Sequence, residues 1–243
     1  MPNILSLHDK RLRAQHYLLF HYRKYLSFYF SFLFKPSCFQ YLNSILLISS
    51  QLTIFAMSES NLDSYRFYYN SGVERSSKGD HQGALKDYTK ALEFNPNSAD
   101  TYNNRGTVKR IIGDYKGALD DYSRVIYINY NDYSAFYNRA TLNDELGDYE
   151  AALKDYNQVI RLRPDFVHSY YFRSLIYKRK RNYKAAIQDL NKVLLIDTRY
   201  VGAYKNRGIA KELSGDIEGA CRDWREVLGV GRSDAMRWVA DQC

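Results

Sequence analysis

The sequence is poor in the residues that build small catalytic and metal sites. It contains three cysteines, five histidines and four prolines among 243 residues. Three cysteines cannot build a disulfide scaffold, and no Cys-x-x-Cys or Cys/His cluster indicates zinc. No glycine-rich phosphate loop is present, and no nucleophile, base and orienting residue recur together. These absences argue against an enzyme, a metal centre or a cofactor.

Charge is unevenly distributed along the chain. The formal net charge is +8, but residues 1–56 hold six Lys and Arg against one acid, Asp9. Residues 57–243 hold 29 basic and 26 acidic residues, so this larger part is nearly balanced. A dedicated nucleic-acid binder would show a basic stripe or face. The balance therefore argues against nucleic acid as the partner.

The first 56 residues lack glycine, valine and glutamate altogether. Val, Ala, Asp, Glu and Gly, whose codons all begin with G, supply three of these residues but 64 of the 187 that follow. Coding sequence is usually rich in these five amino acids. We therefore regard residues 1–56 as a dubious segment and expect translation to start at Met57.

Two other interpretations of this segment stay open. Residues 37–57 are mainly apolar and long enough to span a bilayer. Positive residues before this span and Glu59 and Asp63 after it would leave the rest of the chain outside the cytoplasm. A cleaved signal peptide is the third interpretation, although Ile54-Phe55-Ala56 is a poor small-x-small cleavage site.

Residues 65–234 contain five copies of a 34-residue unit. Segments such as "GDYKGALDDYSRVI" and "GDYEAALKDYNQVI" recur at this interval without insertion, which indicates a repeat architecture. The units occupy residues 65–98, 99–132, 133–166, 167–200 and 201–234. Residues 57–64 form a lead-in, and we expect residues 235–243 to form a closing helix.

Each unit carries two apolar stripes with helical spacing, so we predict a pair of helices per unit. Small residues recur once in each stripe, which lets two helices approach closely. They are Gly72, Gly106, Ala140, Ser174 and Gly208 in the first stripe, and Ala84, Ala118, Ala152, Ala186 and Ala220 in the second. A Gly-Asp pair between the stripes predicts a C-terminal glycine followed by an Asp N-cap. In the fourth unit Arg181-Asn182 replaces it, and we expect a strained or differently shaped turn there because Arg lacks glycine's freedom at positive φ.

With this period and these small, alanine and aromatic positions, the sequence closely resembles the tetratricopeptide repeat family, and its ending resembles that of bacterial members. Pro96 and Pro164 lie at the turn between units, as in the family. The resemblance implies an all-α fold, a right-handed superhelix (α-solenoid) of five helix-turn-helix repeats. Four residues stand where the family often has an aromatic: Arg75, Lys109, Asn143 and Lys211.

Charged residues recur on both helical stripes, where apolar residues would be expected. Arg105, Arg139, Arg173 and Arg207 share the first stripe, and Asp87, Asp121, Asp155, Asp189 and Asp223 share the second. A partly buried charge is costly unless it is paired, so we expect structural ion pairs. Because the first repeat has Ser71 in place of arginine, we predict pairing across repeat boundaries. The predicted pairs are Asp87–Arg105, Asp121–Arg139, Asp155–Arg173 and Asp189–Arg207, with Asp223 left to Arg237 of the closing helix.

By the resemblance, the first helices line an inner surface that binds peptides in this family. The sixth residue of each unit faces this surface, and it is asparagine in every unit except the fourth, which has Phe172. An asparagine amide donates and accepts at once, so a ladder of them can hold an extended peptide backbone. We predict Asn70, Asn104, Asn138 and Asn206 as peptide-binding residues, with Tyr137, Tyr171 and Phe172 as aromatic anchors. The alternative is that asparagine is simply common at this position.

The sequence therefore predicts a non-enzymatic scaffold or adaptor in the cytoplasm that binds a protein or peptide segment. The Lys, Asn, Asn, Lys, Arg pattern with which some family members clamp a chaperone's C-terminal carboxylate is absent, so we expect no such partner. Two alternatives remain: a membrane-anchored assembly factor with its repeats outside the cytoplasm, and an RNA-binding helical-repeat protein. In a reducing cytoplasm we expect Cys221 and Cys243 to be two small buried thiols, whereas export would favour a disulfide between them.

Overall fold

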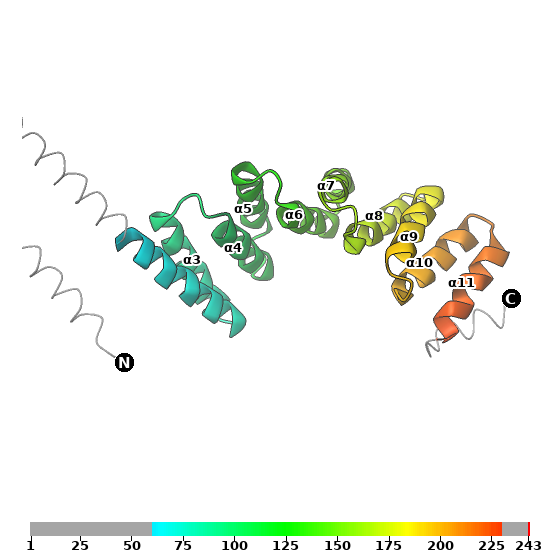
Figure 1. Cartoon of the computed structure of the whole chain (residues 1–243), viewed down its shortest axis with the longest axis horizontal. Helices are drawn as coiled ribbons and strands as arrows, with labels where there is room; N and C mark the ends of the chain where they lie inside the picture. Colours follow the sequence, from blue (N-terminus) through cyan, green and yellow to red (C-terminus); the bar gives the residue numbers. More distant parts are fainter. Residues whose placement is uncertain (1–59, 230–242) are drawn as a thin grey trace, which may run out of the picture. The chain divides into compact units, whose positions relative to one another are not determined.

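The computed structural model describes residues 60–229 and Cys243 (Figure 1). Residues 60–77 are helical, so the described part of the predicted lead-in belongs to the first helix. The helices that follow within the described residues are α3 (His81–Phe94), α4 (Ala99–Ile111), α5 (Tyr115–Ile128), α6 (Tyr133–Leu146), α7 (Tyr149–Leu162), α8 (Val167–Arg179), α9 (Tyr183–Ile196), α10 (Val201–Leu213) and α11 (Ile217–Gly229). The possible anchor at residues 37–57, the start at Met57 and most of the closing helix at 235–243 lie outside the described residues.

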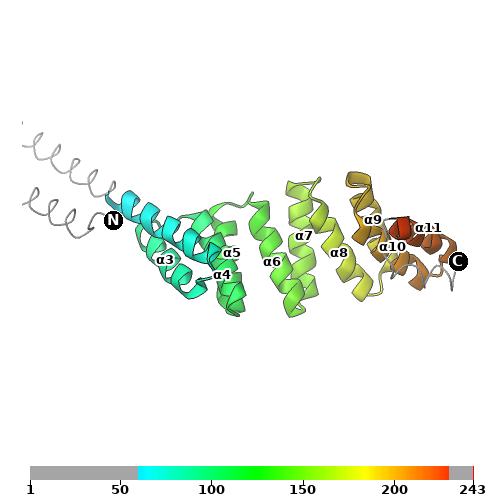
Figure 2. The same ribbon diagram turned by 90° about the horizontal axis from the view of Figure 1, so that it is seen from below.

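The helices pack as a row of antiparallel pairs, which makes this part of the chain an all-α solenoid (Figures 1 and 2). Each 34-residue unit after the first supplies one pair: α4 with α5, α6 with α7, α8 with α9, and α10 with α11. The second helix of each pair also packs against the first helix of the next. The first helices α4, α6, α8 and α10 begin at residues 99, 133, 167 and 201, the first residue of each unit. The predicted all-α solenoid is therefore confirmed.

The Gly-Asp turns have the predicted geometry. Gly113 adopts φ 85°, in the left-handed region that glycine tolerates, and the Asp114 side chain accepts a hydrogen bond from the Gly117 backbone nitrogen. In the fourth repeat Arg181 takes the same left-handed conformation, with φ 57°, while Asn182 caps α9. The turn therefore keeps its shape, and the backbone strain falls on a residue with a Cβ atom.

Small residues allow the two helices of a repeat to approach closely. A Cβ atom on Gly106 would lie 2.9 Å from the ring of Tyr122, and one on Gly208 would lie 3.0 Å from Trp224. The small position in the second stripe is fully buried in every repeat. Ala118, for example, lies beside the buried Tyr122. The core is thus a repeated layer of aromatic rings packed against small residues. Burial in this layer raises the pKa of the Tyr122 hydroxyl.

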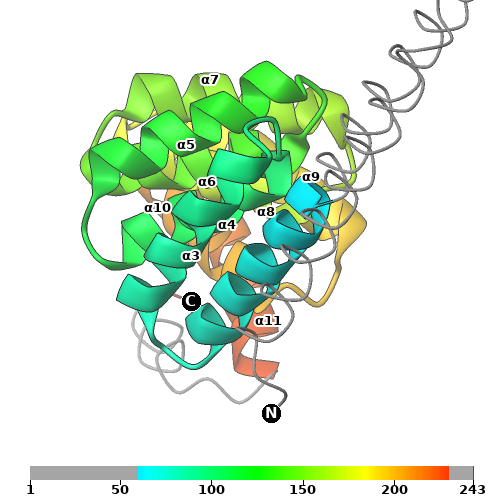
Figure 3. The same ribbon diagram turned by 90° about the vertical axis from the view of Figure 1, so that its left-hand side faces the viewer.

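The first helices lie on the inner side of the array. Consecutive first helices from α4 to α10 contact one another, whereas no two second helices among α3, α5, α7, α9 and α11 do so. When the first helices of successive hairpins lie closer together than the second helices, the row curves toward the first helices. Figure 3 agrees, since α4, α6 and α8 lie toward the middle of the view and α5 and α7 lie toward its edge. We call the surface formed by the helical residues 60–77, α4, α6, α8 and α10 the inner face.

Candidate binding face

The predicted asparagine ladder lies on the inner face, and its amides link neighbouring repeats. Asn104 Nδ2 donates to the Tyr69 hydroxyl at 3.2 Å, and Asn138 Nδ2 donates to Asn103 Oδ1 at 2.9 Å. Each of these bonds joins a first helix to the one before it. Both ladder asparagines are half-buried, whereas Asn70 in the first repeat is exposed. The sequence did not reveal this inter-repeat role, and the peptide-binding role stays a prediction.

Each linked amide keeps hydrogen-bonding capacity. The Asn104 and Asn138 side-chain oxygens accept no hydrogen bond from residues in the described part of the chain, and one N–H of each amide is in use. The inter-repeat bond fixes the rotation of the amide. The two side-chain oxygens are therefore acceptors with a fixed orientation.

The charged residues on the two stripes form ion pairs, but the predicted pairing across repeat boundaries is wrong. Each arginine binds the aspartate of its own repeat through two hydrogen bonds. Arg139, for instance, donates from Nε and Nη2 to the two carboxylate oxygens of Asp155 at 2.7 and 2.8 Å. The observed pairs are Arg105–Asp121, Arg139–Asp155, Arg173–Asp189 and Arg207–Asp223. Asp223 is thus paired with Arg207 rather than left over, and Arg237 lies outside the described residues.

The first repeat shows why the absence of an arginine there was misleading. Asp87 accepts a hydrogen bond from the Ser71 hydroxyl at 2.6 Å and forms an ion pair with Arg75 Nε at 3.2 Å. The cation simply comes from one turn further along the same helix. Asp87 therefore has its partners inside its own repeat and does not need Arg105.

The basic residues that depart from the family pattern supply a second cation to these aspartates. Lys109 Nζ lies 2.9 Å from Asp121, and Lys211 Nζ lies 2.9 Å from Asp223. In the described part of the chain Asp155 pairs only with Arg139, because the position that matches Lys109 in its repeat is Asn143. The repeats therefore differ in how strongly the buried carboxylate is neutralised.

The third nitrogen of each arginine reaches into the preceding repeat. Arg139 Nη1 donates to the Ser123 hydroxyl at 2.9 Å, and Arg207 Nη1 donates to Asn191 Oδ1 at 2.7 Å. The guanidinium also lies over the aromatic ring one turn earlier, as Arg139 does over Phe136 at 5.8 Å. The arginines thus do bond across the repeat boundary, but their partners there are neutral side chains and not aspartates.

The predicted aromatic anchors belong to one continuous cluster on the inner face of repeats three and four. The Tyr137 ring contacts Phe172, with centroids 6.2 Å apart, and the Phe172 ring contacts Tyr171 at 5.5 Å. The Tyr171 ring contacts Tyr200, just before α10, at 4.9 Å. The Tyr137, Tyr171 and Phe172 side chains are half-buried, so part of each ring remains open. The cluster lies where Phe172 interrupts the asparagine ladder.

Beside this cluster, Asn206 joins an aromatic residue to a cation. Asn206 Nδ2 donates to the Tyr171 hydroxyl at 3.0 Å, and Asn206 Oδ1 accepts from Lys178 Nζ at 2.6 Å. Burial lowers the pKa of Lys178, and the positive charges of Arg179 and Lys205 lower it further. The inner face of α8 and α10 is therefore both aromatic and positively charged.

Ion pairs also link the ends of successive first helices. Arg110 of α4 pairs with Glu145 of α6, and Asp144 of α6 pairs with Arg179 of α8. Burial raises the pKa of Asp144 even though Arg179 opposes the shift. The sign of the charges alternates from one repeat to the next. These pairs consume the charges of both Asp144 and Arg179.

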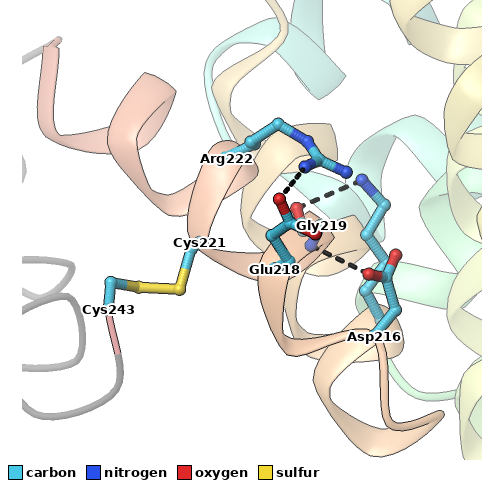
Figure 4. The surroundings of a disulfide bond; sticks show 7 residues. Asp216, Glu218, Gly219, Cys221, Arg222 and Cys243 are labelled. Atoms are coloured by element: carbon cyan, nitrogen blue, oxygen red, sulfur yellow. Dashed lines mark hydrogen bonds and ion pairs between the residues drawn. A yellow bond between two sulfur atoms is a disulfide. The ribbon is translucent and has the colours of Figure 1, made fainter.

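Cys221 and Cys243 form a disulfide (Figure 4), so the expectation of two buried thiols, made for a reducing cytoplasm, is wrong. Their Cα atoms are 5.7 Å apart, and the two residues are separated by 22 positions in the sequence. Cys221 is buried on α11, close to the turn where Asp216 Oδ1 accepts from the Gly219 nitrogen. The disulfide therefore ties the end of the chain to the last helix pair.

Neither a metal cluster nor a membrane span occurs among the described residues. Residues 60–229 and Cys243 contain no group of three or more His, Cys, Asp or Glu side chains placed to hold a metal ion. Within the same residues, none of the helices has the length and apolar character needed to cross a bilayer. The possible anchor at residues 37–57 is not among them, so this finding leaves it untested.

Family models match the repeats directly. The model described as "Tetratricopeptide repeat" matches residues 133–166, a second of the same description matches residues 167–200, and one described as "TPR repeat" matches residues 74–110. The first two matches have the same bounds as the third and fourth units. No curated protein matches the chain.

Solved structures share the fold. A tetratricopeptide repeat protein from Parabacteroides merdae is 27% identical with a TM-score of 0.67, over 74% of this chain and 72% of that one. The MamA protein is 24% identical with a TM-score of 0.65, over 69% and 91% of the two chains. YrrB, described as a TPR protein with an unusual peptide-binding site, is 20% identical with a TM-score of 0.63, over 72% and 91%. The 34-residue period, the stacked helix pairs and the three family matches identify the chain as a tandem tetratricopeptide repeat protein, a member of a family of protein–protein interaction scaffolds.

Proposed function

We propose that this protein is a non-enzymatic scaffold that binds an extended segment of a partner protein on its inner face. The observation that carries the proposal is the pair of half-buried amides, Asn104 and Asn138, held in fixed orientation by inter-repeat hydrogen bonds. Their side-chain oxygens accept nothing from the described residues. Oriented acceptors at regular intervals suit the regularly spaced N–H groups of an extended peptide, whatever its side chains.

The aromatic cluster supports the same proposal. Partly open tyrosine and phenylalanine rings give a large contact area with few rotatable bonds, and such residues are enriched at protein interfaces. Tyr137, Tyr171 and Phe172 lie on the same inner face as the amides. We therefore assign backbone binding to the asparagines and side-chain binding to the rings.

Site-specific photocrosslinking in the native cells tests this assignment. A photoreactive residue at Thr107, exposed on α4, reports on the inner face, and one at Tyr127, which is 79% exposed on α5, reports on a second helix. We expect a protein to crosslink at residue 107 and to be lost when Asn104 and Asn138 are both changed to Ala. Asn131→Ala, an exposed asparagine in a turn, is the matched control and should leave the crosslink intact.

Other outcomes would contradict the proposal. A crosslink at residue 127 alone would move the binding surface to the second helices. Crosslinked RNA instead of protein would favour the RNA-binding alternative. An inner-face crosslink that survives the double asparagine variant would remove the amides from the mechanism while keeping the face.

The Cys221–Cys243 disulfide favours a second candidate, in which the same scaffold is held at a membrane with its repeats outside the cytoplasm. Structural disulfides persist in oxidising compartments, whereas the cytoplasm keeps thiols reduced. Our leading proposal remains a scaffold in the cytoplasm. Fractionation of the native cells, with free thiols blocked before lysis, distinguishes the two: a soluble protein with blocked cysteines supports the cytoplasm, and an oxidised protein in the membrane fraction supports the second candidate.

A further inference from the structure

Lys178 is an exception among the basic residues of the inner face. Arg105 and Arg139 each pair with a carboxylate of their own repeat, and Arg110 pairs with Glu145. The half-buried Lys178 has no carboxylate partner among the described residues, and its ammonium is held only by Asn206 Oδ1. A partly desolvated cation without an anion is costly, so this position is prepared for a negative charge from elsewhere.

The surroundings strengthen this preference. Lys178 has positive neighbours in Arg179 and Lys205, which lower its pKa together with burial. Among the described residues Arg179 pairs with Asp144 of α6, so the Asp144 carboxylate is already engaged. A ligand carboxylate at Lys178 would compensate for the desolvation of the ammonium.

The cation and the aromatic cluster form one continuous site. Asn206 bonds both to the Tyr171 hydroxyl and to the Lys178 ammonium, so its amide bridges the two. The Tyr171 ring in turn contacts Phe172 and Tyr200. A ligand that reaches the ammonium therefore also reaches an aromatic wall.

We propose that the inner face of α8 and α10 recognises a peptide segment that carries a large apolar or aromatic residue close to an aspartate or glutamate. The apolar side chain packs against Tyr171 and Phe172, and the carboxylate pairs with Lys178. The amide of Asn206 bonds both the Tyr171 hydroxyl and the Lys178 ammonium, so these two groups are close neighbours. An extended peptide reaches both the aromatic wall and the cation within about two to three residues. This inference rests on the proposed function and gives the partner its chemistry.

A protein carboxylate fits this site better than the phosphate of a nucleic acid. RNA-binding proteins follow the backbone with a stripe of cations, and residues 57–243 are nearly neutral, with 29 basic and 26 acidic residues. On the inner face Asp144 and Glu145 already neutralise Arg179 and Arg110, so these arginines offer little attraction to a long polyanion. A single carboxylate on an otherwise apolar segment needs only one cation, Lys178.

The test is selection from a random peptide display library on the immobilised full-length protein. We expect the selected peptides to carry Phe, Tyr, Trp or Leu with Asp or Glu within about three residues. A synthetic peptide of the selected sequence then serves as the probe in fluorescence anisotropy, beside a copy with Lys in place of the acid and a short RNA. The acidic peptide should bind at least about tenfold more tightly than the Lys copy, and the RNA should not compete.

Charge reversal on the protein supplies the decisive control. Lys178→Glu should lower the affinity for the acidic peptide by about tenfold or more and raise the affinity for the copy that carries Lys in place of the acid. Lys184→Glu makes the same charge change at an exposed residue of α9 and should alter neither affinity. Circular dichroism of both variants confirms that the fold is kept.

The outcomes separate this inference from the proposed function. The selected peptides could lack acidic residues and still lose their binding when Asn104 and Asn138 are changed to Ala. That result would overturn this inference and support the peptide-binding scaffold. Equal effects of Lys178→Glu and Lys184→Glu would also overturn it. If the library yields no peptide whose binding depends on the inner face, both the inference and the proposed function are overturned. If RNA competes with the acidic peptide, the inference is overturned in favour of a nucleic-acid phosphate as the group bound at Lys178.

Discussion

The buried carboxylates predict that equivalent arginines contribute unequally to stability. Within residues 60–229, Arg139 is the only cation on Asp155, whose side chain is 4% exposed, whereas Asp121 has both Arg105 and Lys109. Changing Arg139 to Met leaves a buried carboxylate without a partner, which costs about 3–5 kcal/mol. Changing Arg105 to Met leaves Lys109 in place, so we expect a loss of about 1.5–3 kcal/mol, the range for hydrogen bonding to a charged group. The difference of about 2 kcal/mol corresponds to roughly 4–8 °C in the midpoint of thermal unfolding.

Urea unfolding followed by circular dichroism measures this difference, and hydrogen exchange locates it in the affected repeat. The internal control is the double change of Arg105 and Lys109 to Met, which should lower stability about as much as Arg139→Met alone. Ser123→Ala removes only the bond to the preceding repeat and should cost about 1 kcal/mol. Equal losses for Arg105→Met and Arg139→Met, or a larger loss for Arg105→Met, would refute the argument that neutralisation of the aspartate decides the cost.

Three further predictions follow from particular contacts. Changing Arg181 to Gly should raise the midpoint of thermal unfolding in calorimetry, because a left-handed non-glycine residue costs about 1 kcal/mol; a lower midpoint would show that the turn is unstrained. Burial raises the pKa of Asp144 against the opposing charge of Arg179, so the stability contributed by this carboxyl is complete below its unfolded pKa and is lost as the pH rises through its folded pKa. Asp144→Asn should therefore gain stability relative to the unaltered protein between about pH 3 and pH 7, and a pH-independent difference in urea unfolding would contradict this. Reduction of the Cys221–Cys243 disulfide should cost about 3 kcal/mol, given its separation of 22 residues, and a double Ser variant should unfold at one midpoint with or without reductant.

Local chemistry explains what could be predicted from the sequence. A glycine followed by Asp114 contains both signals that end one helix and begin the next, and neither depends on distant residues. The first-helix starts at residues 99, 133, 167 and 201 follow from the same period. Because identical units stack on one another, knowledge of one hairpin and its period extends to the array. The all-α solenoid was therefore predictable in full.

The inner face could be predicted only in part. The sequence placed Asn104, Asn138 and the aromatic residues on one surface, but it did not show that the amides bond to the preceding helix. Nor did it single out Lys178, because a lysine without an acid nearby in sequence is common. Its lack of a carboxylate partner among the described residues depends on which side chains the neighbouring first helices bring alongside it.

The sequence by itself determined the helices, their turns and the small residues that let them pack, because each of these depends on neighbours within a few positions. It did not determine which arginine meets which aspartate. Asp121 is 16 residues from Arg105 and 18 from Arg139, so separation along the chain barely distinguishes the two partners. Only the tertiary structure decides, because the tight turn sets Arg105 against Asp121 within the hairpin and turns the remaining nitrogen of Arg139 toward Ser123.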